Sequence, residues 1–196
     1  MFFSKKIRKL NISKTAEVVD LALSLKSKGH KVINMASGEL SFKPALKVRK
    51  EACRVINRGQ TLYTQVAGLK ELRELICQKI QSDLNVKYRE DEIIVSNGGK
   101  QVIYNALQST LNPGDEVIIV SPYWVSYPEI VKLCQGKPKV LESKRENGFS
   151  IDTKKLEKLI TSKSKWLILN SPNNPTGVVY STETMKKLVL VLRKYP

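Results

Sequence analysis

Two glycines beside a lysine, in the segment Ser96–Gln101, have the chemistry to bind a phosphate group. Gly98 and Gly99 directly precede a stretch of helical periodicity that begins near residue 100. Glycine lets the backbone approach an anion closely, and the free amides and positive dipole end of the following helix favour a phosphate. The segment matches neither common nucleotide-binding glycine pattern, so a plain turn stays open as an alternative.

Two further segments carry side chains suited to a planar, polar ligand. Ser121–Pro128 holds three aromatic residues and two prolines, and Asn170–Gly177 holds asparagines next to prolines. The first would offer a stiff surface for stacking a ring, although Trp124 and Tyr127 could equally fill space beside a helix. The second would fix side-chain amides that can donate to a phenolate-like oxygen, or would be an ordinary capped turn.

The surrounding pattern predicts the elements that position these three loops. Short apolar runs alternate with helical segments, which is typical of an α/β fold with a mostly parallel sheet and helices on both faces. In such sheets ligands bind beyond the carboxyl ends of the strands, where the three loops would gather. The predicted strands are Ile93–Val95, Val117–Val120, Pro138–Leu141 and Trp166–Leu169, and the predicted helices lie near 100–111, 126–135, 152–161 and 182–194.

The first part of the chain has a different order of elements. We expect a helix near 14–28 capped by Ser13, a short strand near 31–35, and helices near 45–58 and 69–83. We therefore divide the chain into an N-terminal arm with its first helix and strand, residues 1–44, and a body of residues 45–196.

Composition excludes several classes of protein. The 196 residues include 34 Lys and Arg against 18 Asp and Glu, a net charge of +16, and 41% are hydrophobic, as in a globular chain. The basic residues are scattered among acidic ones, which indicates a solvated surface rather than a nucleic-acid face. Three cysteines without a Cys-x-x-Cys pair and one histidine give no support for a disulfide scaffold or a metal site. Without a long apolar run or a signal peptide, we expect a cytoplasmic protein with no membrane contact.

Taken together, these motifs resemble the class I pyridoxal phosphate (PLP)-dependent aminotransferases. More narrowly they are similar to the bacterial aspartate, or aspartate/prephenate, group, in order and spacing from about Ser13 to Pro196. The segments that carry the resemblance are Tyr63–Gly68, Gly98–Gln101, Ser121–Pro128 and Asn174–Gly177.

The resemblance implies transfer of an amino group between an amino acid and a 2-oxo acid, in amino acid metabolism, with pyridoxal 5′-phosphate as cofactor. Trp124 would stack on the cofactor ring, and Asn174 would donate to its phenolic oxygen and lie against the substrate carboxylate. Tyr63 would reach the phosphate of a partner subunit, which implies a homodimer. The residues implied to bind the cofactor are Gly98, Gly99, Lys100, Gln101, Trp124, Asn174 and Tyr63; those implied to contact substrate are Gly38, Trp124 and Asn174.

The family's covalently anchoring lysine, which is also the base, and its ring-binding aspartate follow the asparagine loop. No Asp follows Asn174 here, and the remaining lysines, Lys186, Lys187 and Lys194, fall in or beside the last predicted helix. We therefore expect the N-terminal part of a fold type I large domain, truncated at its C-terminus, with no catalytic residue of its own and no activity alone.

A second departure lies near Gly38, where Leu40 and Ser41 replace the family's usual Pro and Asp. Three alternatives remain open: another PLP-dependent lyase or synthase with the same loops, a basic non-catalytic binding protein, and a remnant without a selected role.

Overall fold

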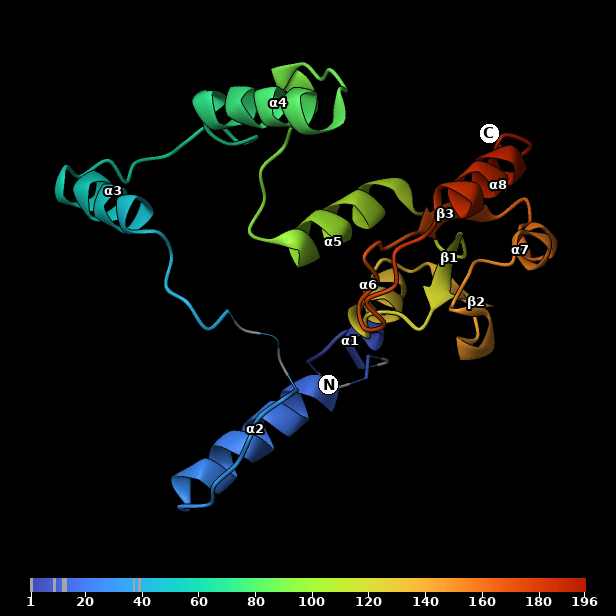
Figure 1. The fold of residues 1–196 in the computed structure, drawn as a ribbon, viewed down its shortest axis with the longest axis horizontal. Helices are drawn as coiled ribbons and strands as arrows, with labels where there is room; N and C mark the ends of the chain where they lie inside the picture. The colour runs from blue at the N-terminus through green and yellow to red at the C-terminus, as the bar shows by residue number, and fades with distance from the viewer. Residues whose placement is uncertain (1, 9, 12–13, 37, 39) are drawn as a thin grey trace. The chain divides into compact units, whose positions relative to one another are not determined.

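The computed structural model describes residues 2–8, 10–11, 14–36, 38 and 40–196. They form two compact units, one of residues 17–99 and one that joins residues up to 16 with residues 100–196. Figure 1 shows the elements along the chain. The helices are α1 (Lys5–Arg8), α2 (Lys14–Ser27), α3 (Leu46–Asn57), α4 (Lys70–Leu84), α5 (Gly99–Thr110), α6 (Ser126–Leu133), α7 (Thr153–Leu159) and α8 (Thr182–Leu192); the strands are β1 (Glu116–Ser121), β2 (Lys137–Glu142) and β3 (Ser164–Ile168).

A parallel sheet forms the centre of the 100–196 unit. Its strand order is β2-β1-β3, and both neighbours of β1 run parallel to it. Val117 lies opposite Pro138 on one side and Trp166 on the other. The predicted α/β fold with a parallel sheet is confirmed, as are the three strands predicted within this unit.

Strand β1 is buried on both faces because helices cover each of them. Val117 and Ile119 pack with residues of α5 and α6, whereas Ile118 and Val120 pack with residues of α7 and α8. Successive side chains of a strand point to opposite faces, so the unbroken apolar run of β1 needs helices on both sides. Figure 1 shows α6 on one side of the sheet and α7 and α8 on the other.

The amino-terminal end of the sheet is held by a polar cluster around Glu116. Its carboxylate accepts hydrogen bonds from Thr161 Oγ1 at 2.6 Å and Ser164 Oγ at 3.3 Å, and pairs with Lys139 Nζ at 3.2 Å. The Thr161 hydrogen bond, with the help of Lys139, lowers the pKa of Glu116 below its ordinary value. This cluster ties β1 to β2 and β3 at the end opposite to the loops discussed below.

The 17–99 unit consists of helices and connecting segments. The helices predicted near 14–28, 45–58 and 69–83 are present as α2, α3 and α4. The predicted strands at 31–35 and 93–95 are wrong, since neither segment is in strand conformation. A strand needs a hydrogen-bonded neighbour; Ile33 is 89% exposed, and Val95 N donates one bond to Ala67 O at 2.9 Å.

Some expectations are not tested by this fold. Ser13, the expected cap of α2, lies outside the described residues, and the division of the chain at residue 44 stays a prediction. Among the described residues, none of the helices combines the length and apolar character needed to cross a membrane.

Candidate functional site

The loops that follow β1 and β3 leave the sheet at the same edge, because these strands are adjacent and parallel. One side chain ties the two loops together. Asn173 is buried, with 9% of its surface exposed, and it donates from Nδ2 to Pro122 O at 3.0 Å and to Thr176 Oγ1 at 2.9 Å. The amide therefore links the loop after β3 to the backbone of the loop after β1.

A second side chain holds the loop after β1 from the direction of β2. Ser143, which directly follows β2, donates from its hydroxyl to the carbonyl oxygen of Ser121. Two consecutive carbonyls, those of Ser121 and Pro122, are thus hydrogen-bonded by side chains from the two flanking strand ends. These bonds fix the start of the segment that carries Trp124.

The asparagine loop also closes on itself. Asn173 N donates to Val178 O at 2.9 Å, and Gly177 N donates to Asn173 O at 2.7 Å. The backbone amide of Asn174 donates to Asn170 Oδ1 at 2.7 Å, and Asn174 itself is exposed. The loop therefore holds the backbone of Asn174 in place while its side chain faces outward.

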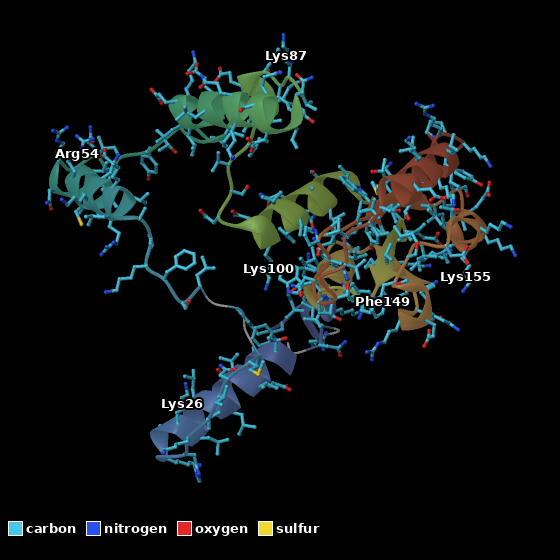
Figure 2. All side chains as sticks on the ribbon, in the orientation of Figure 1. Lys26, Arg54, Lys87, Lys100, Phe149 and Lys155 are labelled. Atoms are coloured by element: carbon cyan, nitrogen blue, oxygen red, sulfur yellow. The ribbon has the colours of Figure 1, made fainter. Side chains whose placement is uncertain are left out.

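Trp124 is half-buried between the sheet layer and the surface. Its ring meets Tyr127 edge-on, with centroids 5.5 Å apart at an angle of 89°. Lys100, at the start of α5 (Figure 2), places Nζ 5.1 Å from the centroid of the Trp124 ring. A lysine over an indole is a cation–π contact. The space-filling alternative describes both aromatics: Tyr127 packs in the core, where burial raises its pKa, and Trp124 packs against the same cluster. Stacking of a ring on Trp124 stays a prediction.

The glycine segment has free space around its backbone, although Gly98 N already donates to Ser96 O at 2.8 Å. Gly98 has φ of +85°, a conformation that other residues rarely adopt, and Gly99 is the first residue of α5. A Cβ atom at either position would meet nothing within 4 Å. The first amides of an α-helix lack an acceptor within the helix. This end of α5 can therefore admit an anion close to the backbone, with Lys100 beside it.

The structure brings together only part of the predicted residue set. Lys100 and Trp124 are in contact, and the loops of Trp124 and Asn174 are joined through Asn173. The side chain of Gln101 is exposed. Tyr63 and Gly38 are both exposed in the 17–99 unit, and their part in the site stays a prediction.

The sequence predicts the asparagine loop but indicates no role for Asn173. A loop that buries a carbonyl beside two asparagines needs one of them to turn inward as its donor. Two neighbouring asparagines indicate that one can be buried as a donor while the other is exposed, although the pair does not show which of the two is buried.

The sequence model of "Aminotransferase class I and II" matches residues 30–196. This chain belongs to the class I and II aminotransferases. Among its relatives, the "Probable aspartate/prephenate aminotransferase" of Rhizobium leguminosarum bv. phaseoli is 44% identical over 195 residues, covering 100% of this chain and 49% of the relative. The "Aspartate/prephenate aminotransferase" of Cereibacter sphaeroides is 42% identical, with coverage of 100% and 49%.

Solved aminotransferase structures agree with this family. Aspartate aminotransferase from Thermus thermophilus with maleate gives a TM-score of 0.95 at 37% identity, over 99% of this chain and 51% of that one. Alanine aminotransferase from Pyrococcus furiosus gives 0.91 at 28% identity, over 98% and 50%. This aminotransferase chain spans about half the length of the relatives it matches.

Proposed function

We propose that this chain supplies the part of an aspartate-type aminotransferase that binds the phosphate and ring of pyridoxal 5′-phosphate. The enzyme would move an amino group between an amino acid and a 2-oxo acid. The observation that carries the proposal is the junction of the β1 and β3 loops through Asn173, with Lys100 held against Trp124 beside it. The names of the relatives support the aspartate type.

The residues present fit this cofactor. Its phosphate is a dianion, and the open backbone of Gly98 and Gly99 at the start of α5 suits it. Its planar ring suits the half-buried indole of Trp124. Its phenolic oxygen suits the exposed amide of Asn174, which the loop backbone holds in place.

The chain's own residues would bind and orient rather than transfer the proton. When bound, the cofactor supplies an electron sink for the pair of electrons left as an amino acid loses its α-proton. Lys100 would neutralise phosphate charge, and Trp124 would fix the plane of the ring. Asn174 would hold the phenolic oxygen and approach the substrate carboxylate.

The proton-transferring base is not among the lysines after the asparagine loop, in our proposal. Lys186 and Lys187 lie on α8, and Lys187 pairs with Glu183 at 2.7 Å. Lys194 pairs at 2.8 Å with Glu157, which lies on α7. We therefore propose that these 196 residues bind the cofactor without anchoring it covalently and are inactive by themselves. We further propose that the active enzyme is a cytoplasmic homodimer, to which Tyr63 contributes across the interface.

Tryptophan fluorescence tests the cofactor site, because the chain has two tryptophans. Trp124 lies in the proposed site. Trp166 lies on β3, and its Nε1 donates to Thr110 Oγ1 at 2.8 Å. Titration with PLP is expected to quench the wild-type chain and Trp166→Phe, but not Trp124→Phe. Pyridoxal without phosphate is expected to bind more weakly. Equal quenching in the two variants would refute the site.

Borohydride reduction tests the absence of covalent anchoring. After incubation with PLP and reduction, mass analysis is expected to show only low, scattered labelling of lysines. A stoichiometric adduct on a single lysine would overturn this part of the proposal and identify the anchoring residue.

A further inference from the structure

Arg73, in α4, is the one buried charged residue among those described. Its side chain is 9% exposed. Removing a guanidinium group from water is costly unless partners compensate the charge and fill its donors. The position is not within an apolar core, since its helix neighbours Leu72 and Leu75 are 42% and 58% exposed. The contacts of Arg73 must therefore explain its burial.

The guanidinium group connects α4 to two other segments of the 17–99 unit. Nε donates to Gly68 O at 3.2 Å, and Nη2 donates to Gln65 Oε1 at 2.7 Å. On the other side, Nη1 donates to Glu90 O at 2.9 Å, and Nη2 pairs with Glu90 Oε2 at 3.4 Å. That buried oxygen of Glu90 makes no hydrogen bond, so the ion pair is its compensation. A planar fork of fixed donors suits this task, and an ammonium does not.

The turn that Arg73 holds contacts the segment leading into the glycine loop. Gly68 N donates to Gln65 O at 2.9 Å and closes the turn, while Ala67 O accepts from Val95 N at 2.9 Å. Gly68 has φ of +101°, and a Cβ there would lie 2.9 Å from Val95 Cβ. The two backbones therefore pack closely, one residue before Ser96.

We propose that Arg73 is a positioning residue that fixes the turn Gln65–Gly68 against Val95. Through this contact, the buried cation of Arg73 fixes the position of the segment that follows Tyr63 and of the residues that lead into the loop of Gly98 and Gly99. The importance of these two segments for a phosphate rests on the proposed function, whereas the positioning itself does not.

Hydrogen exchange measured by mass spectrometry on the whole chain tests the positioning. Arg73→Lys keeps the charge but loses the fork, and Arg54→Lys is the matched control, because Arg54 is an exposed arginine paired with Glu51 on α3. We expect exchange in peptides covering 65–68 and 93–99 to rise on the order of 10-fold in Arg73→Lys. Peptides of α3, and all peptides in the control, are expected to keep wild-type rates. Unchanged exchange, or a uniform rise across residues 17–99, would overturn the proposal.

A second variant keeps the test decisive if Arg73→Lys does not fold. Gln65→Leu removes one acceptor of the guanidinium and leaves the arginine in place. It is expected to raise exchange in the same two peptides, and wild-type exchange at Val95 would overturn the positioning role.

The ligand measurement separates the two proposals. If the proposed function is right, Arg73→Lys also weakens PLP binding severalfold in the Trp124 fluorescence assay. If the wild-type chain binds no PLP while the exchange pattern is found, the proposed function fails and the positioning role of Arg73 stands.

Discussion

Replacing Asn173 by alanine tests whether one buried amide holds the β1 and β3 loops together. The change removes two hydrogen bonds, to Pro122 O at 3.0 Å and to Thr176 Oγ1 at 2.9 Å. A neutral hydrogen bond contributes about 0.5–1.5 kcal/mol net, so their loss is expected to lower the free energy of unfolding by roughly 1–3 kcal/mol. For a chain of this size, that corresponds to a fall in Tm of roughly 2–12 °C.

Denaturant unfolding followed by tryptophan fluorescence is the appropriate assay. Both tryptophans, Trp124 and Trp166, belong to the 100–196 unit, so their signal reports on the unit that contains the two loops. The transition midpoint is expected to fall while the slope stays constant, because the change removes contacts without altering the surface exposed on unfolding.

The adjacent residue provides the control. Asn174 is exposed, and its backbone amide, which alanine retains, makes the bond to Asn170 Oδ1. Asn174→Ala is expected to change stability by less than about 0.5 kcal/mol while weakening PLP binding. If Asn173→Ala and Asn174→Ala show the same unfolding midpoint, the hydrogen bonds of Asn173 between the β1 and β3 loops do not stabilise this edge of the sheet.

Three further predictions concern other parts of the chain. Hydrogen bonding from Thr161 lowers the pKa of Glu116 in the folded chain. The Glu116 carboxylate therefore stabilises the fold above its ordinary pKa of 4.5, and this stabilisation is lost as the pH falls through the lower, folded pKa. The stability difference between wild type and Glu116→Gln, measured by urea unfolding, is expected to shrink on acidification. Gly136→Ala would place a Cβ 3.0 Å from two side-chain carbons, and calorimetry is expected to show a loss of roughly 1–3 kcal/mol. Cys53 is exposed, whereas Cys134 is buried with a raised pKa; a thiol reagent is expected to label Cys53 at once and Cys134 only on unfolding.

The sheet could be predicted from the sequence because its strands are short and strongly apolar. The run Val117–Val120 has no polar residue, as expected for a strand covered on both faces. Helices between such strands then impose parallel pairing, since the chain must cross over to start the next strand. These are local patterns, so the sequence suffices to recognise them.

The two wrong strands show where local patterns are insufficient. Ile93–Val95 is as apolar as a strand, but its backbone amides bond to turns, Ile93 N to Glu90 O and Val95 N to Ala67 O, rather than to a neighbouring strand. Pairing depends on a neighbour elsewhere in the chain, and an apolar run does not reveal whether that neighbour exists. The predicted strand at 31–35 is wrong for the same reason.

The loops of the candidate site were predictable as loops, but their supporting contacts were not. Prolines, glycines and asparagines mark Ser121–Pro128 and Asn170–Gly177 in the sequence. The bond of Asn173 to Pro122 O and the bond of Arg73 to Glu90 O join residues 51 and 17 positions apart, respectively, and no local pattern encodes them. Arg73 in particular looks like any arginine on an exposed helix face until its partners are placed.

In two places, a buried residue that holds the backbone lies close in sequence to an exposed residue of the proposed site, and this arrangement has a physical reason. A loop that recognises a ligand must expose polar groups, yet exposed groups on an unsupported backbone pay the entropy of ordering when they bind. In the loop after β3, buried Asn173 makes the structural bonds and exposed Asn174 is left to bind. Near α4, buried Arg73 holds the turn that follows exposed Tyr63. In both places the ordering cost is met within the chain before any ligand arrives, so the loss of either buried partner should weaken binding even though neither is expected to touch the ligand.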